Sequence, residues 1–171
     1  MAKIFGTSII ENHFAFGNSN KIYQLQINLM IITMSYVNLN VHCVWSTKNR
    51  VPFLDSRALR FKVWTHILNN ARAKGIFIDT INGYSDHCHC LISLRGYQTV
   101  QDIMQYIKGE SSFWINIEGL TPEKFSWQEE YYAVSVSQKY LHSVRQYIRN
   151  QEEYHSDKSF QEELRELNFD D

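Results

Sequence analysis

Two hydrophobic periods run along the chain: alternation in some segments, and an apolar residue every three or four positions in others. Strand-like segments, rich in β-branched and aromatic residues, predict strands over residues 36–45, 76–82, 87–94 and 131–136. The helical period predicts helices over residues 56–74, 99–117 and 137–153. Ser56 and Ser137 are expected to cap the first and third helices, and Gly75 to end the first. The order β-α-β-β-α-β-α predicts an α+β, ferredoxin-like fold, an antiparallel sheet with helices on one face plus a C-terminal helix.

The two ends of the chain do not continue this pattern. We expect an N-terminal extension over residues 1–33, a domain over 34–153 and an acidic tail over 154–171, with a short amphipathic helix at 160–169. Met34 directly precedes the first strand, so the extension is either a start-codon artefact or an additional strand or arm. Polar and charged residues interrupt it, which argues against a signal peptide and a membrane span.

Composition indicates one globular domain in a reducing compartment. Of the 171 residues, 44% are hydrophobic and 14% aromatic, enough for a substantial core. Three cysteines without framework spacing indicate free thiols, so we expect a cytoplasmic protein. The net charge of −1 combines a mildly basic middle with an acidic tail. The basic excess permits nucleic-acid binding, although solvated surface charge is its commoner cause.

Two histidines one residue apart begin the third predicted strand. In an extended strand His87 and His89 point to one face and Cys88 and Cys90 to the other. The two imidazoles can converge on one metal ion, with Asp86 as an orienting partner, or they can be two hydrogen-bonded histidines at a strand start. A zinc site made by all four is disfavoured, because paired zinc ligands are separated by two or more residues. We expect the cysteines in the core.

A tyrosine and a glutamine lie four residues apart in the third predicted helix. On one helix face, Tyr147 and Gln151 would offer a phenol and an amide oxygen together, whereas Tyr147 alone would be interpreted as a core residue. A phenol is a weak nucleophile unless it loses its proton or the electrophile is activated, as by a divalent ion on a phosphate oxygen. Attack on a phosphodiester would form a phosphotyrosine ester, which conserves bond energy for rejoining.

These residues carry a resemblance to a known family. The His87-Cys88-His89 motif, Tyr147 followed by Gln151, and residues 45–50 (Trp-Ser-Thr-Lys-Asn-Arg) resemble the single-tyrosine HUH transposases of small bacterial insertion sequences. The repetitive-element-associated tyrosine transposases are similar. The resemblance covers roughly residues 34–153 and includes the segments at 106–109, 111–112 and 127–128. Cys88 departs from the bulky aliphatic residue usual at its position, and the family does not require residues 1–33.

The resemblance implies a metal-dependent endonuclease and strand transferase that acts on single-stranded DNA in the bacterial cytoplasm. His87, His89 and Gln151 would hold Mg²⁺ or Mn²⁺. Tyr147 would attack the phosphodiester and leave a 5′-phosphotyrosine link and a free 3′-hydroxyl. The substrate would be the hairpin ends of a mobile element, and the protein would be a homodimer without membrane contact. The tyrosine helix could complete the site of its own chain or of the partner.

Five residues are expected to contact DNA: Trp45, Lys48, Arg50, Lys108 and Arg145. Lys48 and Arg50 can reach phosphates, and Trp45 either stacks on an unpaired base or continues the apolar face of the first strand into the core. For the other two, ordinary helix-surface charge is the alternative. One rival function is a domesticated relative that binds DNA hairpins without cutting them. Another is a ferredoxin-like RNA-binding domain, but the strand-borne aromatic motifs of that class are missing.

Overall fold

The computed structural model describes residues 37–155. The predicted extension at 1–33 and the predicted tail helix at 160–169 lie outside the described residues, so these domain boundaries stay predictions. No helix in the described range is both long and apolar enough to cross a membrane.

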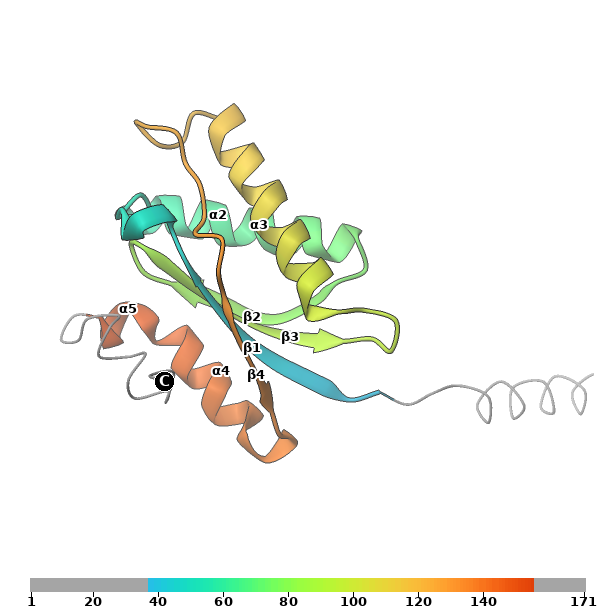
Figure 1. The fold of residues 1–171 in the computed structure, drawn as a ribbon. Coiled ribbons are helices and arrows are strands. Elements are labelled where there is room, and N and C mark those ends of the chain that lie inside the picture. Colours follow the sequence, from blue (N-terminus) through green and yellow to red (C-terminus); the bar gives the residue numbers. More distant parts are fainter. Residues whose placement is uncertain (1–36, 156–171) are drawn as a thin grey trace, which may run out of the picture. The chain divides into compact units, whose positions relative to one another are not determined.

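Four antiparallel strands form a single sheet (Figure 1). The strands are β1 (Leu39–Ser46), β2 (Phe77–Gly83), β3 (His87–Leu94) and β4 (Tyr132–Val136). Their order across the sheet is β2-β3-β1-β4, so the two central strands are β1 and β3. This order, with helices between the strands, confirms the predicted α+β, ferredoxin-like fold. The bounds of β3 agree with the prediction, and those of the other strands shift by a few residues.

Two long helices cover one face of the sheet, α2 (Arg57–Ala73) and α3 (Val100–Ile117) (Figure 1). The predicted cap is present, because the Ser56 side chain accepts a hydrogen bond from the N–H of Leu59. Gly75 ends the α2 segment with a φ of 70°, a left-handed conformation that glycine adopts without steric cost. The apolar stripes of both helices pack on the sheet and form the main core.

The other face carries α4 (Leu141–Arg149) and α5 (Gln151–Tyr154) (Figure 1). The prediction of one continuous helix over 137–153 is wrong. A short 3-10 turn, η2 (Gln138–Tyr140), comes first, and Asn150, with a φ of −92° and a ψ of 13°, separates α4 from α5. Ser137 precedes the turn but makes no capping hydrogen bond with its side chain. The broken helix still packs against β2 and β3.

Candidate active site

The candidate residues lie on the sheet face beneath α4 and α5. In the antiparallel register Val44 of β1 is opposite His89 of β3, and Ser46 is opposite His87. Because side chains alternate along each strand, His42 shares this face with His87 and His89, and all three imidazoles are buried. The structure therefore brings the two histidines of the motif to one face, as predicted, and adds a third.

The cysteines of the motif occupy the opposite face. Cys88 and Cys90 are fully buried with Cys43 in the core beneath α2 and α3. Burial raises the pKa of the Cys43 thiol to about 12 and the pKa values of Cys88 and Cys90 well above their ordinary range. The thiols are therefore protonated at neutral pH and pack as small apolar side chains of the core.

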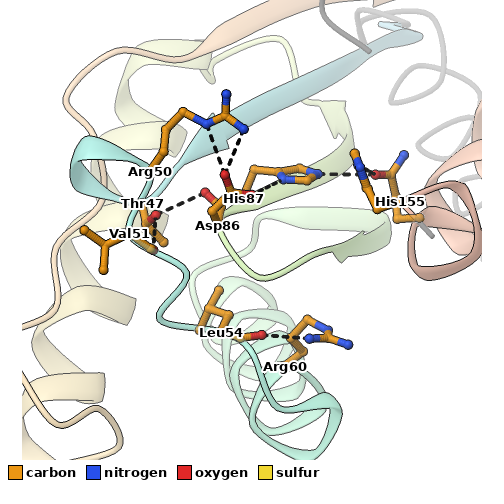
Figure 2. Close-up of polar contacts among 9 residues, drawn as sticks. Thr47, Arg50, Val51, Leu54, Arg60, Asp86, His87 and His155 are labelled. Carbon is orange, nitrogen blue, oxygen red and sulfur yellow. Dashed lines mark hydrogen bonds and ion pairs between the residues drawn. The ribbon is translucent and has the colours of Figure 1, made fainter. Parts of the chain in front are cut away.

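His87 belongs to a chain of polar contacts that begins in the loop after β1 (Figure 2). Its Nδ1 donates to Asp86 Oδ1 at 2.8 Å, while Asp86 Oδ2 accepts from Nε and Nη2 of Arg50 at 3.0 and 2.9 Å. A proton on Nδ1 leaves Nε2 as the ring atom that can bind a cation. This Nε2 atom faces Oε1 of Gln151 at a distance of 3.4 Å.

Hydrogen bonds hold the loop that contains Arg50 against Asp86, the residue before β3. The backbone N–H and the hydroxyl of the buried Thr47 donate to the Asp86 carbonyl at 2.8 and 3.2 Å, and Asn49 and Arg50 have φ values of 53° and 57°. Burial opposes ionisation of Asp86, but the hydrogen bonds from His87 and Arg50 outweigh it and hold the pKa of the carboxyl below its usual value. Asp86 is therefore an anion at neutral pH and orients the His87 ring.

His89 is oriented by the third buried histidine. Its Nδ1 atom lies 3.1 Å from Nε2 of His42, and the two rings stack with their centroids 5.3 Å apart. For Nε2 of His89 to bind a cation, the proton of its ring must sit on Nδ1 and be donated to His42. In that state His42 would orient the His89 ring, as Asp86 orients the His87 ring.

Gln151 brings an amide oxygen to the histidines. It is fully buried at the start of α5. Its Oε1 atom accepts a hydrogen bond from Nε2 of His155 at 3.1 Å and lies 3.4 Å from Nε2 of His87. The rings of His155 and His87 meet edge to face with their centroids 4.5 Å apart, and His155 stacks on Tyr84.

Tyr147, on α4, completes the cluster. Its half-buried ring meets His89 and His42 edge to face, with centroid separations of 5.6 and 6.1 Å, and also contacts Tyr154. The structure therefore brings together within one chain the predicted nucleophile and the three predicted ligands. Asn150 separates α4 from α5, so Tyr147 and Gln151 reach the histidines without sharing one continuous helix.

Ion pairs tie both short helices to the rest of the domain. Arg145 of α4 donates through Nε and Nη2 to the Asp79 carboxylate of β2, at distances down to 2.7 Å. The hydrogen bonds from Arg145 hold the pKa of Asp79 below its usual value. Arg60 of α2 donates to Glu152 of α5 at 3.1 Å. It also donates to the Leu54 carbonyl at 2.8 Å (Figure 2). These contacts position Tyr147 and Gln151 over the histidines.

The donor set suits a divalent cation. Nε2 of His87 lies 3.4 Å from Oε1 of Gln151, and with the ring proton on Nδ1 a cation between these two atoms would be stabilised. Imidazole nitrogens and amide oxygens are ordinary ligands of divalent metals in proteins. Among residues 37–155, no three His, Cys, Asp or Glu side chains form a metal-binding group by themselves.

Comparison with a family model identifies the chain. The model described as "Transposase IS200 like" matches residues 35–151, a range that contains the histidine pair, the tyrosine and the glutamine. The chain belongs to the IS200-like transposase family. A comparison of this chain with curated protein sequences found no significant match.

Two solved structures have the fold of this IS200-like transposase. One is a candidate transposase from Deinococcus radiodurans R1, with 22% identity and a TM-score of 0.54; the likeness covers 70% of this chain and 94% of the other. The second is a REP-associated tyrosine transposase bound to a REP hairpin, with 17% identity and a TM-score of 0.53, covering 71% of this chain and 72% of the other. At these identities the likeness establishes the fold alone.

One predicted DNA contact of this family member is a core residue. The exposed fraction of Trp45 is only 1%, and its ring packs edge to face on Trp127 beneath α2 and α3. The expectation that Trp45 stacks on an unpaired base is therefore wrong, and the alternative that it continues the apolar face of the first strand is confirmed. The tryptophan lies on the sheet face opposite the histidines, because it alternates with Val44 and Ser46.

The four predicted cationic contacts occupy different settings. Lys48 is exposed in η1 (Lys48–Arg50), directly after the strand end that lies beside His87. Arg50 and Arg145 are engaged by Asp86 and Asp79 as described above. Lys108, on α3, donates to the carbonyls of Glu129 and Glu130 at 2.6 and 3.3 Å, and burial lowers the pKa of its ammonium group. DNA contact stays a prediction for all four, and Lys48 has the most suitable position.

Sequence reasoning missed two histidines of this cluster. His42 is one of the polar residues that alternate with apolar residues in the first strand. This position indicates a place beside His89 only when β1 and β3 are known to be neighbours. His155 follows Gln151 by four residues, the spacing that places side chains on one helix face. That signal was present in the sequence, within the segment assigned to the acidic tail.

Proposed function

We propose that this chain is a metal-dependent endonuclease and strand transferase that cuts and rejoins single-stranded DNA with Tyr147 as its nucleophile. One observation carries the proposal: the phenol ring lies against His89 while Gln151 lies against His87, so nucleophile and ligand set meet at one place. Membership of the IS200-like transposase family supports this class of reaction. DNA strand transfer is what a transposase requires.

Each residue of the site has a separate role in the proposed reaction. His87, His89 and Gln151 would hold Mg²⁺ or Mn²⁺, and a bound ion would polarise the scissile phosphate and neutralise charge on its oxygens. Asp86 and His42 fix the ring protons on the sides away from the ion. The Tyr147 oxygen forms a bond to phosphorus and gives its proton to water, while the bond from phosphorus to the 3′ oxygen breaks and that oxygen takes up a proton. The products are a 5′-phosphotyrosine link and a free 3′-hydroxyl.

We further propose that the substrate is a DNA hairpin at the end of a mobile element. The hairpin-bound REP-associated transposase, which has the same fold, supports this choice of DNA. Lys48, exposed beside the strand end that carries His87, can neutralise a phosphate close to the reacting bond. The second candidate function, a relative that binds hairpins without cleavage, lacks a specific observation in its favour because all four reactive side chains converge.

A homodimer is part of the proposal. Strand β4 lies at the edge of the sheet, and its exposed residues include Tyr132 and Val134, with exposed fractions of 41% and 40%. Edge strands with exposed backbone and apolar side chains are sites where a second chain can pair. Sedimentation of the full chain at the concentration used for cleavage should give the mass of a dimer; a monomer that cleaves normally would refute this part.

Covalent capture of DNA tests the proposed chemistry. A hairpin oligonucleotide with single-stranded flanks, labelled at its 3′ end, is incubated with the full chain and Mn²⁺ and then denatured. The label should migrate with the protein, and a 5′-labelled copy should release a fragment whose 3′-hydroxyl a polymerase can extend. Tyr147→Phe should abolish both signals, because the attacking oxygen is gone.

The matched control is Tyr154→Phe, which changes the neighbouring phenol that packs against Tyr147. This variant should keep the adduct. If wild type binds the hairpin but gives no adduct with any divalent ion, the non-cleaving alternative is correct. If Tyr147→Phe still forms the adduct, another residue is the nucleophile.

A further inference from the structure

One imidazole of the cluster has no part in the function proposed so far. His155 follows α5 and is partly buried, and its Nε2 atom donates a hydrogen bond to Oε1 of Gln151 at 3.1 Å. The same oxygen lies 3.4 Å from Nε2 of His87. The rings of His155 and His87 also meet edge to face, with their centroids 4.5 Å apart (Figure 2). His155 therefore contacts two members of the proposed ligand set.

We propose that His155 is a positioning residue of the cation site, whose N–H holds the side-chain amide of Gln151 with its oxygen, and not its NH₂ group, toward His87. The oxygen is then already in place when a cation arrives. This inference rests on the proposed function, because it concerns the orientation of a ligand in the set of His87, His89 and Gln151. It gives His155 no contact with the cation or with DNA.

The amide of Gln151 needs such an interaction because it can turn over. The oxygen and the NH₂ group of an amide side chain exchange places with little change of shape. A cation can bind Nε2 of His87 only when the ring proton is on Nδ1, the state in which His87 donates to Asp86. In that state the free Nε2 atom is an acceptor, and the NH₂ group of Gln151 would be its better partner. The observed orientation, with Oε1 toward His87, gives up that hydrogen bond.

The hydrogen bond from His155 favours the observed orientation. An N–H group can donate to the oxygen of the amide but not to its NH₂ group, which has no lone pair to offer. If the amide of Gln151 turned over, its NH₂ group would face the N–H of His155, and the hydrogen bond of 3.1 Å would be lost. Because Gln151 is fully buried, loss of this partner would be costly. The amide oxygen keeps a second lone pair for a cation.

The ring of His155 is itself held by the hairpin between β2 and β3. It stacks on Tyr84, with the centroids 5.3 Å apart, and the guanidinium group of Arg60 lies over the Tyr84 ring at 5.1 Å from its centroid. The backbone N–H of His155 donates to the carbonyl of Gln151 at 3.1 Å, and Arg60 donates to Glu152 of α5. These contacts direct the side-chain N–H of His155 at Gln151 in the folded domain, before any cation binds.

Mn²⁺ binding by the full chain, measured by the electron paramagnetic resonance signal of the free ion, tests the inference without DNA. His155→Phe keeps a ring that can stack on Tyr84 but removes the donor, so Mn²⁺ affinity should fall by about tenfold or more. His155→Gln removes the ring but returns an N–H donor of similar reach, so its affinity should stay within about threefold of wild type. The reverse order of the two variants would show that ring packing matters and would overturn the inference.

A second pair of variants tests whether His155 acts through the amide. Gln151→Glu presents an oxygen toward His87 whichever way the carboxylate is turned, so this ligand does not need an N–H to orient it. His155→Phe combined with Gln151→Glu should therefore bind Mn²⁺ within about threefold of Gln151→Glu alone. An equal loss in both backgrounds would mean that His155 supports only the packing of α5, and the inference would be wrong.

Two reference variants separate failure of the inference from failure of the proposed function. His142→Phe makes the same chemical change at an exposed histidine of α4 and should bind Mn²⁺ as wild type does. His87→Ala should lose the Mn²⁺ site. If His155→Phe binds like wild type while His87→Ala does not, His155 is not a positioning residue and the proposed function stands. If His87→Ala also binds like wild type, the cation site of the proposed function is itself wrong.

Discussion

The two faces of the sheet both bury side chains of β3, and the chemistry of those side chains differs. Beneath α2 and α3 the side chains are apolar, and they include the fully buried Cys88, Cys90 and Trp45. Beneath α4 and α5 the fully buried side chains include His87 and His89, from the same strand as the two cysteines. Residues 87–90 of β3 thus alternate between the polar cluster and the hydrophobic core, and the buried Leu91 adds an apolar side chain to the histidine face.

The difference shows that burial alone does not define a core. A buried polar group costs free energy unless it is hydrogen-bonded, and an apolar face of the same volume would stabilise the domain at least as well. In the polar cluster each imidazole of the motif has an orienting partner, Asp86 for one and His42 for the other. Such an arrangement specifies ring orientation and proton position, which an apolar core does not require. The polar face is therefore the one whose side chains fit the proposed chemistry.

Truncation of the largest side chain on the apolar face should have the greatest effect on stability. Trp45→Ala removes a buried aromatic that packs on Trp127, so the free energy of unfolding should fall by about 3–5 kcal/mol. Urea denaturation followed by circular dichroism measures this change. DNA affinity per folded molecule should be unaltered. Normal stability combined with lost DNA binding would instead restore a role in stacking on a base.

A change in the support of the polar face should affect metal binding more than folding. Asp86→Asn keeps the shape of the side chain but removes the charge that holds the proton on Nδ1 of His87. Mn²⁺ affinity should fall by about 10–100-fold, measured by the electron paramagnetic resonance signal of the free ion. Asp55→Asn, at an exposed aspartate, is the control and should bind Mn²⁺ normally. Equal affinity in both variants would show that Asp86 does not act through His87.

The smallest expected effect concerns the attachment of α4, and it depends on pH. Because hydrogen bonds from Arg145 lower the pKa of Asp79, folding favours the ionised carboxylate. The resulting stabilisation is fully present above the ordinary aspartate pKa of about 4 and is lost as pH falls through the lower folded value. Asp79→Asn should therefore lower the denaturation midpoint at pH 7, and its difference from wild type should shrink below pH 4. A difference independent of pH would mean that the contact does not depend on the charge.

Much of the fold follows from local pattern, and the exceptions have physical causes. The alternation in β1 and β3 and the caps at Ser56 and Gly75 placed those elements because each depends on neighbouring residues. The third helix was predicted as one piece because its apolar period continues through Asn150. The break there accompanies the burial of Gln151 against His87 and the ion pair of Glu152 with Arg60, contacts between residues far apart in sequence.

The candidate site was predictable where chemistry-bearing residues share a short motif. His87, His89, Tyr147 and Gln151 were identified from spacing and resemblance, and the structure brings them together. Arg50 was recognised as a cation, but its pairing with Asp86 depends on the register between β1 and β3, which one sequence does not determine. A similar limit applies to His42, whose role appears only when the neighbouring strand is in place.

The backbone of the loop after β1 is strained beside the candidate site. Two consecutive non-glycine residues, Asn49 and Arg50, occupy left-handed conformations that cost about 1 kcal/mol or more each for a residue with a Cβ atom. Glycine at position 50 would relieve this strain but would remove the guanidinium group that steadies Asp86. The strained backbone at Arg50 thus coincides with an ion pair to the carboxylate that orients His87, so relief of the strain would cost that ion pair.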